Sequence, residues 1–336
     1  MLFRSVESMK LSDIGEFGFI DRIKKDTIVN PASVVVGIGD DGAVYKTTEG
    51  KEQVAVIDTM IEGRHFIIGK TATWYEAGYK AVASNLSDIA AMGAEPTHLV
   101  LSVALTPQMD AAQTDELYRG MKDICRHYGV NILGGDTVVS SEGAVLTVAA
   151  FGEIEAGKAV LRSGAVAGDI VAVSHTLGNS GAGLDVLLAG DAGYAALKKA
   201  HAMPVPQVEL GRLAVKYGCH SLNDISDGLA SESNEIAAAS HVDLILDKSQ
   251  IPLSDELRRW CEVSGKDPYA YALTGGEDYE LVLTMAPDDF YLLKEEFSSL
   301  TVIGNVQAGS GKVYLKDGHH TQVLAPSGWN HFSGGE

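Results

Sequence analysis

Residues 73–105 read TWYEAGYKAVASNLSDIAAMGAEPTHLVLSVAL and are predicted to form one helix, one short turn and one buried strand. Thr73 and Glu76 have the S/T-x-x-E spacing of a capping box, in which each side chain satisfies a free backbone N–H at a helix start. Gly93 supplies the helix stop before the strand. The stretch is therefore predicted to be one unit in which a helix leads through a short turn into a strand.

The helix in this stretch consists mostly of small residues. Lys80, Ser84 and Asp88 recur at every fourth position, which places them on one stripe of the helix. A helix with few bulky side chains can approach another element closely, so Asp88 could lie at a crowded site. A solvated position fits Asp88 equally well, and this helix alone does not decide between the two.

Length and charge limit the classes of protein that fit. A chain of 336 residues with 46% hydrophobic content can bury a substantial core, and this length favours two domains over one. The 45 acidic and 26 basic residues give a formal charge of −19, which argues against a general binder of nucleic acid or anionic membrane. Recruitment of divalent cations and simple solubility both agree with this acidity.

Cysteine usage and the terminal sequence predict a soluble cytoplasmic protein. Cys125, Cys219 and Cys261 are odd in number and far apart, so neither a disulfide framework nor a structural zinc site is expected. The N-terminal MLFRSVESMKLSD has no apolar signal core, and no run of about eighteen apolar residues occurs.

Strands alternate with helices along both halves of the chain, which predicts an α/β or α+β fold. Residues 53–58 and 131–133 are expected to form strands that place Asp58 and Asp136 at their ends, and residues 178–183 a loop. Residues 110–128 are expected to form an amphipathic helix with an apolar stripe through Leu117, Met121, Ile124 and Tyr128. Residues 155–168 are rich in Gly, Ala and charge and form the expected junction. We therefore expect an N-terminal domain at residues 1–154 and a C-terminal α/β domain at residues 155–336.

Residues 37–42, GIGDDG, match the G-x-G-x-x-G dinucleotide fingerprint. That fingerprint requires a helix N-terminus next to a pyrophosphate, whereas Ala43, Val44 and Tyr45 have strand character here. Asp40 and Asp41 would also repel the anion. A tight acidic turn between two strands is predicted instead, either as a plain hairpin or as a metal-holding loop.

Six aspartates share a setting at turns, at predicted strand ends or on the helix of small residues, usually beside Gly or Ser. They are Asp41, Asp58, Asp88, Asp136, Asp224 and Asp227. Each alone is more often a turn or cap residue. Two carboxylates about 4 Å apart repel by roughly 4 kcal/mol at an effective dielectric of about 20, so several could converge only around cations. Hard oxygen ligands select Mg²⁺ or Ca²⁺, and this many acids would imply several ions with a polyphosphate between them.

A series of motifs along essentially the whole chain resembles the thiamine-monophosphate kinase family, within the superfamily that includes aminoimidazole ribonucleotide synthetase. The motifs are GIGDDGAV (37–44), DTMIEGRHF (58–66), KAVASNLSDIAAMGAEP (80–96), GGDT (134–137), LRSGA (161–165), DISDGL (224–229), GGEDYEL (275–281) and GWNHF (328–332). The third and seventh are specific to the family, whereas DISDG alone indicates only the superfamily. The resemblance implies the two-domain fold of that superfamily, with the N-terminal sheet pairing across a homodimer.

The resemblance also implies roles for individual residues. Mg²⁺ ligands are implied at Asp41, Asp58, Asp88, Asp136, Asp224 and Asp227, with Asp88, Asp136 and Asp227 as the catalytic members. ATP contacts are implied at Tyr118, Gly135, Asp136, Arg162 and Ser226, and thiamine phosphate contacts at His65, Glu277 and Trp329. One departure is that the family commonly has Ser or Thr just before the Asp58 position, where this chain has Val56 and Ile57.

Plain structural explanations remain for several of these residues. Arg162 could be a surface linker residue, although its planar guanidinium suits phosphate. His65 lies in a polar loop, Glu277 could complete a Gly-Gly turn, and Trp329 could anchor the C-terminal tail in a groove.

The function that the resemblance implies is transfer of the γ-phosphoryl group of ATP to thiamine monophosphate, with several Mg²⁺ ions as cofactors. Two other hypotheses stay open. The first is a sister ATP-dependent enzyme that acts on another acceptor, and the second is a non-catalytic nucleotide or divalent-cation sensor. Neither a nucleic-acid nor a membrane partner is expected.

Overall fold

The structure is a computed structural model, and it describes residues 9–39 and 41–328. The chain divides into two compact units. The first consists of Met1–Asn85 and Pro96–Glu153, and the second of Leu86–Glu95 and Ile154–Glu336. Both units combine helices with sheets, so the predicted mixed α/β class is confirmed.

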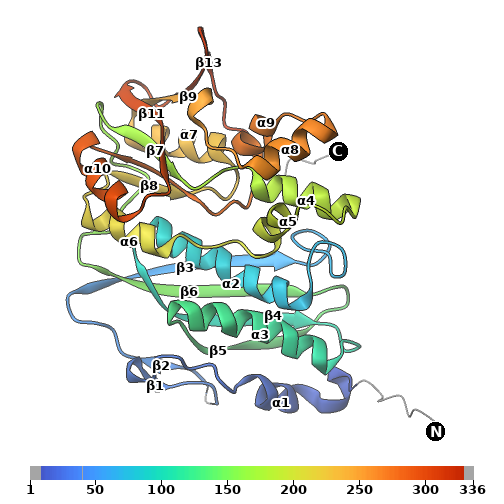
Figure 1. Ribbon diagram of the computed structural model, residues 1–336. Coiled ribbons are helices and arrows are strands. Elements are labelled where there is room, and N and C mark those ends of the chain that lie inside the picture. Colours follow the sequence, from blue (N-terminus) through green and yellow to red (C-terminus); the bar gives the residue numbers. More distant parts are fainter. Residues whose placement is uncertain (1–8, 40, 329–336) are drawn as a thin grey trace. The chain divides into compact units, whose positions relative to one another are not determined.

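The first unit contains a two-stranded sheet and a four-stranded sheet with the order β3-β6-β4-β5 (Figure 1). Its elements in chain order are α1 (Leu11–Ile23), η1 (Pro31–Ser33), β1 (Val34–Val36), β2 (Val44–Tyr45), β3 (Lys51–Ile61), α2 (Trp74–Ala91), β4 (Glu95–Leu105), α3 (Ala111–Tyr128), β5 (Asn131–Val139) and β6 (Val145–Glu155). β1 and β2 pair antiparallel. The segment 37–43 therefore joins two strands, as predicted, and does not lead into a nucleotide-binding helix.

Helix α2 has the start and the stop that its sequence predicts. The Thr73 backbone N–H donates to Glu76 Oε2 at 2.7 Å, and the Glu76 N–H donates to Thr73 Oγ1 at 3.3 Å, which completes the capping box. Gly93 has φ +73°, a left-handed conformation that glycine adopts without strain. The last turn of α2 and the residues up to Glu95 belong to the second unit.

Small residues allow α2 to lie very close to α3, as predicted. A Cβ built on Gly78 would be 2.0 Å from the Leu117 carbonyl oxygen, and one built on Gly120 would be 2.0 Å from the Tyr75 carbonyl oxygen. Figure 1 shows these two helices running side by side. The apolar stripe predicted for α3 is also confirmed, because Leu117 and its helical neighbours Met121 and Ile124 are fully buried.

Strand β5 is longer than the sequence predicts. We expected a short strand over 131–133 with Asp136 at its end, but β5 continues to Val139 and pairs in parallel with β4. A Cβ on Gly135 would be 1.8 Å from the Leu101 carbonyl oxygen. The glycine therefore permits close approach of two strands, and the predicted end of the strand at residue 133 was wrong.

The second unit is built on a seven-stranded sheet with the order β13-β12-β9-β11-β7-β10-β8. Its elements are β7 (Ile170–Ser174), α4 (Asn179–Ala189), α5 (Ala195–Ala202), α6 (Val208–Lys216), β8 (Ser221–Asp224), α7 (Leu229–Ser240), β9 (Val242–Asp247), η2 (Lys248–Gln250), α8 (Asp255–Ser264), α9 (Pro268–Thr274), β10 (Leu281–Met285), α10 (Pro287–Glu296), β11 (Leu300–Ala308), β12 (Val313–Asp317) and β13 (His320–Val323). Helix α7 contacts β8, β9, β10 and β12. It therefore covers the sheet beside the strand that ends in Asp224.

Residues 178–183, GNSGAG, were predicted as a loop, and this prediction was wrong. Helix α4 begins at Asn179 and includes Gly181 and Gly183. A Cβ on Gly183 would be 2.0 Å from the Leu197 carbonyl oxygen. These glycines serve close packing of α4, a tertiary requirement that resembles a loop signal in the sequence.

Within the described residues, no helix has both the length and the apolar character needed to cross a membrane.

Candidate active site

The turn from β8 into α7 presents two of the predicted aspartates. β8 ends at Asp224, and Gly228 precedes the first residue of α7 with φ +117°. A Cβ on Gly228 would be 2.9 Å from the Leu273 carbonyl oxygen, so a larger residue would clash with the end of α9. The glycine therefore fixes a sharp turn that carries Asp224, Ser226 and Asp227.

Asp224 connects this turn to the end of α2. Its side chain is 3% exposed, and its Oδ2 accepts a hydrogen bond from Ser87 Oγ at 2.6 Å. Ser87 precedes Asp88, and both belong to the second unit. The segment carrying Asp88 thus contacts Asp224, and the bond orients one oxygen of a buried carboxylate.

The other three aspartates belong to the first unit. Asp41 is exposed between β1 and β2. Asp58 and Asp136 lie inside β3 and β5, so their predicted location at strand ends was wrong. Both strands extend past the polar residues that we took for their ends. The Asp136 Oδ1 accepts from the Thr137 backbone N–H at 2.9 Å, and Gly135 beside it is also exposed.

Among residues 9–39 and 41–328, no group of three or more His, Cys, Asp or Glu side chains is arranged to hold a metal ion. The predicted ligands instead fall into two sets of three, one in each unit.

Residues 275–280, GGEDYE, meet the β8–α7 turn through backbone hydrogen bonds. The Glu277 N–H donates to the Ser226 carbonyl at 2.7 Å. Ile225 donates to the Glu280 carbonyl at 2.7 Å and accepts from the Tyr279 N–H at 2.9 Å. Glu277 and Tyr279 have φ of 67° and 52°, an uncommon left-handed conformation for residues other than glycine. Two motifs about fifty residues apart in the sequence therefore form one site.

Asp278 anchors this segment, and sequence reasoning did not identify it. Its carboxylate accepts from the Gly178 N–H at 2.6 Å and the Ser180 N–H at 3.0 Å, at the start of α4. Removal of the carboxyl group from water raises the pKa of Asp278 to about 7, although the two N–H groups oppose this change. The available signal was an acid that could cap a helix, but residues 178–183 were taken for a loop.

His201 connects α5 to the same segment. Its side chain is 3% exposed, and its Nδ1 lies 3.2 Å from Ser180 Oγ and 3.5 Å from Glu277 Oε2. The predicted substrate residue Glu277 is therefore held beside a buried imidazole.

Arg162 lies next to the β8–α7 turn. Its Nε is 3.1 Å from Asn223 Oδ1 and 3.1 Å from Glu235 Oε2, while the side chain stays exposed. The second unit thus brings Arg162, Ser226, Asp227 and Glu277 into neighbouring positions around one turn.

Glu232, on the first turn of α7, is a second residue that sequence reasoning missed. Its carboxyl group is 2% exposed and contacts the backbone of Asp227. Burial, with the negative charges of Glu235 and Asp224, raises the pKa of Glu232 well above its ordinary value. An acid five residues after Asp227 was the only signal, and that position is also common for solvated helix residues.

Besides Gly135 and Asp136, two more predicted ligand contacts belong to the first unit, Tyr118 and His65. Tyr118 is 4% exposed and packs edge-to-face on Phe19 with ring centroids 5.8 Å apart, which is the environment of a core aromatic residue. Its ATP contact stays a prediction. His65 Nδ1 accepts from the Ile61 N–H at 2.9 Å, so Nδ1 carries no proton and Nε2 is the nitrogen that can donate.

Trp329 lies outside the described residues. Its neighbour Gly328 is described, and a Cβ built there would be 2.1 Å from the Asp227 carbonyl oxygen. The chain therefore reaches the β8–α7 turn immediately before Trp329.

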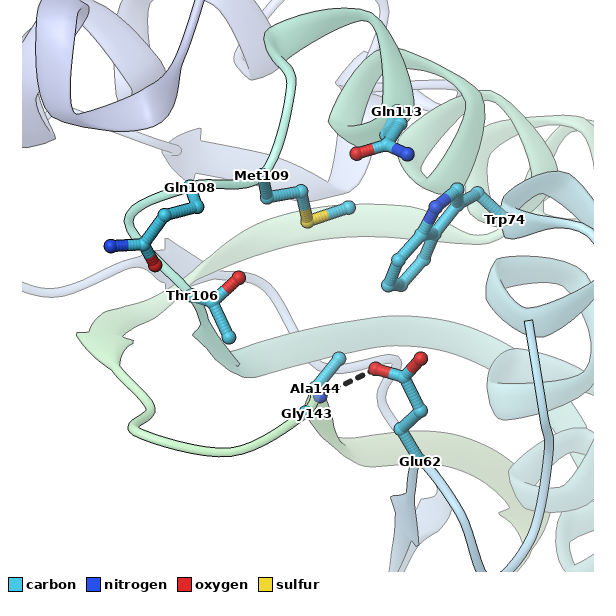
Figure 2. A pocket seen from close by; sticks show the side chains of 8 residues that line it. All are labelled: Glu62, Trp74, Thr106, Gln108, Met109, Gln113, Gly143 and Ala144. Carbon is cyan, nitrogen blue, oxygen red and sulfur yellow. Dashed lines mark hydrogen bonds between the residues drawn. The ribbon is translucent and has the colours of Figure 1, made fainter. Parts of the chain in front are cut away.

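A cavity of about 350 Å³ lies in the first unit and is lined by Glu62, Trp74, Thr106, Gln108, Met109, Gln113, Gly143 and Ala144 (Figure 2). Glu62 Oε2 accepts from the Ala144 N–H at 2.9 Å, which fixes the carboxylate at one side of the cavity. Figure 2 shows Trp74 and Met109 around the same hollow. The predicted site residues are not among those that line it.

Comparison with known protein families first defines the class of protein to which the two domains belong. Residues 39–154 match the family "AIR synthase related protein, N-terminal domain", and residues 166–316 match "AIR synthase related protein, C-terminal domain". The two-domain fold predicted from the sequence is thereby confirmed.

Individual relatives and solved structures then identify the family within this class. The thiamine-monophosphate kinase of Bacillus subtilis (strain 168) is 38% identical over 334 residues, covering 94% of this chain and 99% of the relative. The crystal structure of thiamine-monophosphate kinase from Stenotrophomonas maltophilia K279a matches with 32% identity and a TM-score of 0.81, covering 90% of this chain and 97% of that one. The structure described as AaThiL complexed with AMPPCP and TMP matches with 35% identity and a TM-score of 0.76, covering 97% and 100%. The chain belongs to the thiamine-monophosphate kinase family.

Proposed function

We propose that this protein transfers the γ-phosphoryl group of ATP to thiamine monophosphate, giving thiamine diphosphate and ADP. Its family membership supports this activity, as does its similarity to a structure that contains AMPPCP and TMP. The observation that carries the proposal is the 2.7 Å hydrogen bond from Glu277 to Ser226. It joins the segment expected to bind thiamine phosphate to the turn expected to bind nucleotide and metal.

The reaction places few demands on acid–base chemistry. An oxygen of the acceptor phosphate attacks the γ-phosphorus while the bond from that phosphorus to the β-phosphate oxygen breaks, and ADP leaves with that oxygen. The acceptor has a second pKa of about 6, so it is largely ionised at neutral pH and needs no strong general base. Positioning and charge stabilisation are the main requirements. The Arg162 guanidinium suits phosphate oxygens for this purpose.

The donor set of the predicted ligands fits Mg²⁺, because all six are carboxylates and Mg²⁺ prefers hard oxygen ligands. We propose that Asp41, Asp58, Asp88, Asp136, Asp224 and Asp227 hold several Mg²⁺ ions. When bound, these ions would neutralise phosphate charge and stabilise the transferring group. Ser87 supports this role by orienting the Asp224 carboxylate. Val56 and Ile57 offer no hydroxyl ligand before Asp58, so backbone or water would replace it.

We also propose a homodimer formed through the four-stranded sheet. Its two edge strands carry exposed apolar side chains, Ile57 and Ile61 on β3 and Val138 and Val139 on β5. Exposed apolar edge strands are suited to pairing with another chain. We further propose that the domains comprise residues 1–154 and 155–336, and that the protein is cytoplasmic.

One assay tests the reaction. The protein is incubated with ATP, Mg²⁺ and thiamine monophosphate, and thiamine diphosphate and ADP are measured by chromatography. We expect equal amounts of the two products, with none when Mg²⁺ is removed by a chelator. ATP binding without any thiamine diphosphate would refute the proposal and favour the sensor. ADP formed only with a different phosphate acceptor would favour a sister enzyme.

A further inference from the structure

The carboxyl group of Glu232 contacts the proposed nucleotide and metal turn from inside the second unit. Its Oε1 accepts from the Asp227 backbone N–H at 3.2 Å and lies 3.5 Å from Ser226 Oγ. Its Oε2 accepts from Asn223 Nδ2. One buried side chain thus contacts residues on both sides of Asp224.

Asn223 extends this contact to Arg162. The Asn223 Oδ1 accepts from Arg162 Nε at 3.1 Å, while its Nδ2 donates to both Glu232 and Glu235. A change at Glu232 therefore affects the orientation of the Asn223 amide, and through it the guanidinium proposed to bind ATP.

Different partners hold the two parts of the β8–α7 turn. The backbones of Ile225 and Ser226 are hydrogen-bonded to residues 277–280, whereas the Asp227 N–H donates to Glu232. Burial of a carboxyl group among other acids costs free energy even when it is hydrogen-bonded. The burial of a carboxyl group at position 232 is therefore not explained by a contribution to the stability of the core.

We propose that Glu232 is a positioning residue, which orients the Asp227 backbone directly and the Arg162 side chain through Asn223 for binding of Mg²⁺ and nucleotide. The inference rests on the proposed function, because it assigns Asp227 and Arg162 to that site. Glu232 acts through its neighbours and takes no part in bond making.

The main test measures binding without turnover. Titration calorimetry gives the Kd for AMPPCP in the presence of Mg²⁺ for the wild type and for Glu232→Ala. We expect binding weaker by about tenfold or more, the loss typical when a residue that orients metal ligands is removed. In steady-state kinetics, the KM for ATP should rise while the KM for thiamine monophosphate changes by less than about twofold. A folded Glu232→Ala variant with the wild-type Kd would overturn the proposal.

Glu235→Ala is the matched control. Glu235 lies one turn further along α7, and its side chain contacts Asn223 Nδ2 and Arg162 rather than residues 226–227. Both substitutions remove one acidic side chain near the site, so a purely electrostatic effect would be similar in the two variants. We expect Glu235→Ala to weaken binding less than Glu232→Ala does, because contacts to the Asn223 side chain are lost in both variants whereas the Asp227 N–H keeps its acceptor only in Glu235→Ala. Equal losses in both variants would contradict a role of Glu232 at the Asp227 backbone.

A second variant covers the case in which Glu232→Ala does not fold, as judged by circular dichroism. Glu232→Gln keeps the shape and the acceptor for Asp227 N–H but places a donor against Asn223 Nδ2. We expect an intermediate loss of about three- to tenfold, and wild-type affinity would overturn the proposal.

The proposed function can fail separately from the role of Glu232. If the wild type binds AMPPCP with Mg²⁺ but makes no thiamine diphosphate, the comparison of Kd values still decides the role of Glu232.

Discussion

Asp278 is the residue whose environment differs most from what its sequence position indicates. It lies in a polar Gly-Gly-Glu-Asp segment, yet its carboxyl group is held against the start of α4, and its removal from water raises its pKa from 3.8 to about 7. The folded protein therefore binds a proton between about pH 4 and pH 7 that the unfolded chain has already released. By linkage, the stabilisation from this proton is fully present below about pH 4 and is lost as the pH rises through 7.

We therefore expect Asp278→Asn to flatten the pH dependence of stability. Asparagine mimics the protonated acid, so the variant should lose less free energy of unfolding between pH 4.5 and pH 7.5 than the wild type does. Denaturant unfolding at both pH values measures the difference. Asp191→Asn, a change at an exposed carboxylate, is the control and should leave the wild-type slope in place. An unchanged slope in Asp278→Asn would contradict the assignment.

Asp136 gives a residue-scale test of the proposed metal role. It is exposed on β5, and its side chain accepts from its neighbour Thr137, a bond that asparagine can also make. Asp136→Asn should therefore change the free energy of unfolding by less than about 0.5 kcal/mol. We expect kcat to fall by about 100-fold or more, because a charge that acts at the transferring phosphate is removed. Activity retained at low Mg²⁺ would count against a ligand role.

At the scale of elements, helix α2 shows what local sequence can predict. The capping box at Thr73 and Glu76, the stop at Gly93 and the close approach permitted by small residues were all confirmed. Glycine in other elements was misinterpreted, because we placed Gly135 after the end of a strand and Gly183 in a loop. In both cases the missing Cβ makes room for a carbonyl of a neighbouring element, which local sequence does not show.

The α2–α3 contact can be tested by filling one of its gaps. Gly120→Ala places a Cβ 2.0 Å from the Tyr75 carbonyl oxygen, so the two helices must separate. We expect a loss of about 3 kcal/mol in the free energy of unfolding, at the upper end for an overpacked core. Gly134→Ala adds the same methyl group where no atom lies within 4 Å, and it should change stability by less than about 1 kcal/mol. Similar effects of the two changes would contradict close packing as the cause.

At the scale of the whole molecule, the candidate site depends on strand order. The sequence identified DISDG and GGEDYE separately, and their contact requires β8 to lie beside β10 in the sheet. This neighbour relation joins segments about fifty residues apart, and it follows from packing of the complete second unit. Residues that support the site, such as Glu232 and Asp278, were missed for the same reason, because their partners are set by tertiary structure.

The proposed dimer provides the last test, at the edges of the four-stranded sheet. Val139 on β5 is 75% exposed, and burial of such an apolar side chain against a second copy would stabilise pairing, whereas a lysine there would oppose it. We expect the wild type to elute as a dimer in size-exclusion chromatography with light scattering, and Val139→Lys to shift the protein toward the monomer at micromolar concentration. Val263→Lys, at a 79% exposed position on α8, makes the same chemical change in the second unit and should stay dimeric. Pairing through this edge would be contradicted by a monomeric wild type. It would also be contradicted if the Val139→Lys variant were as dimeric as the Val263→Lys control.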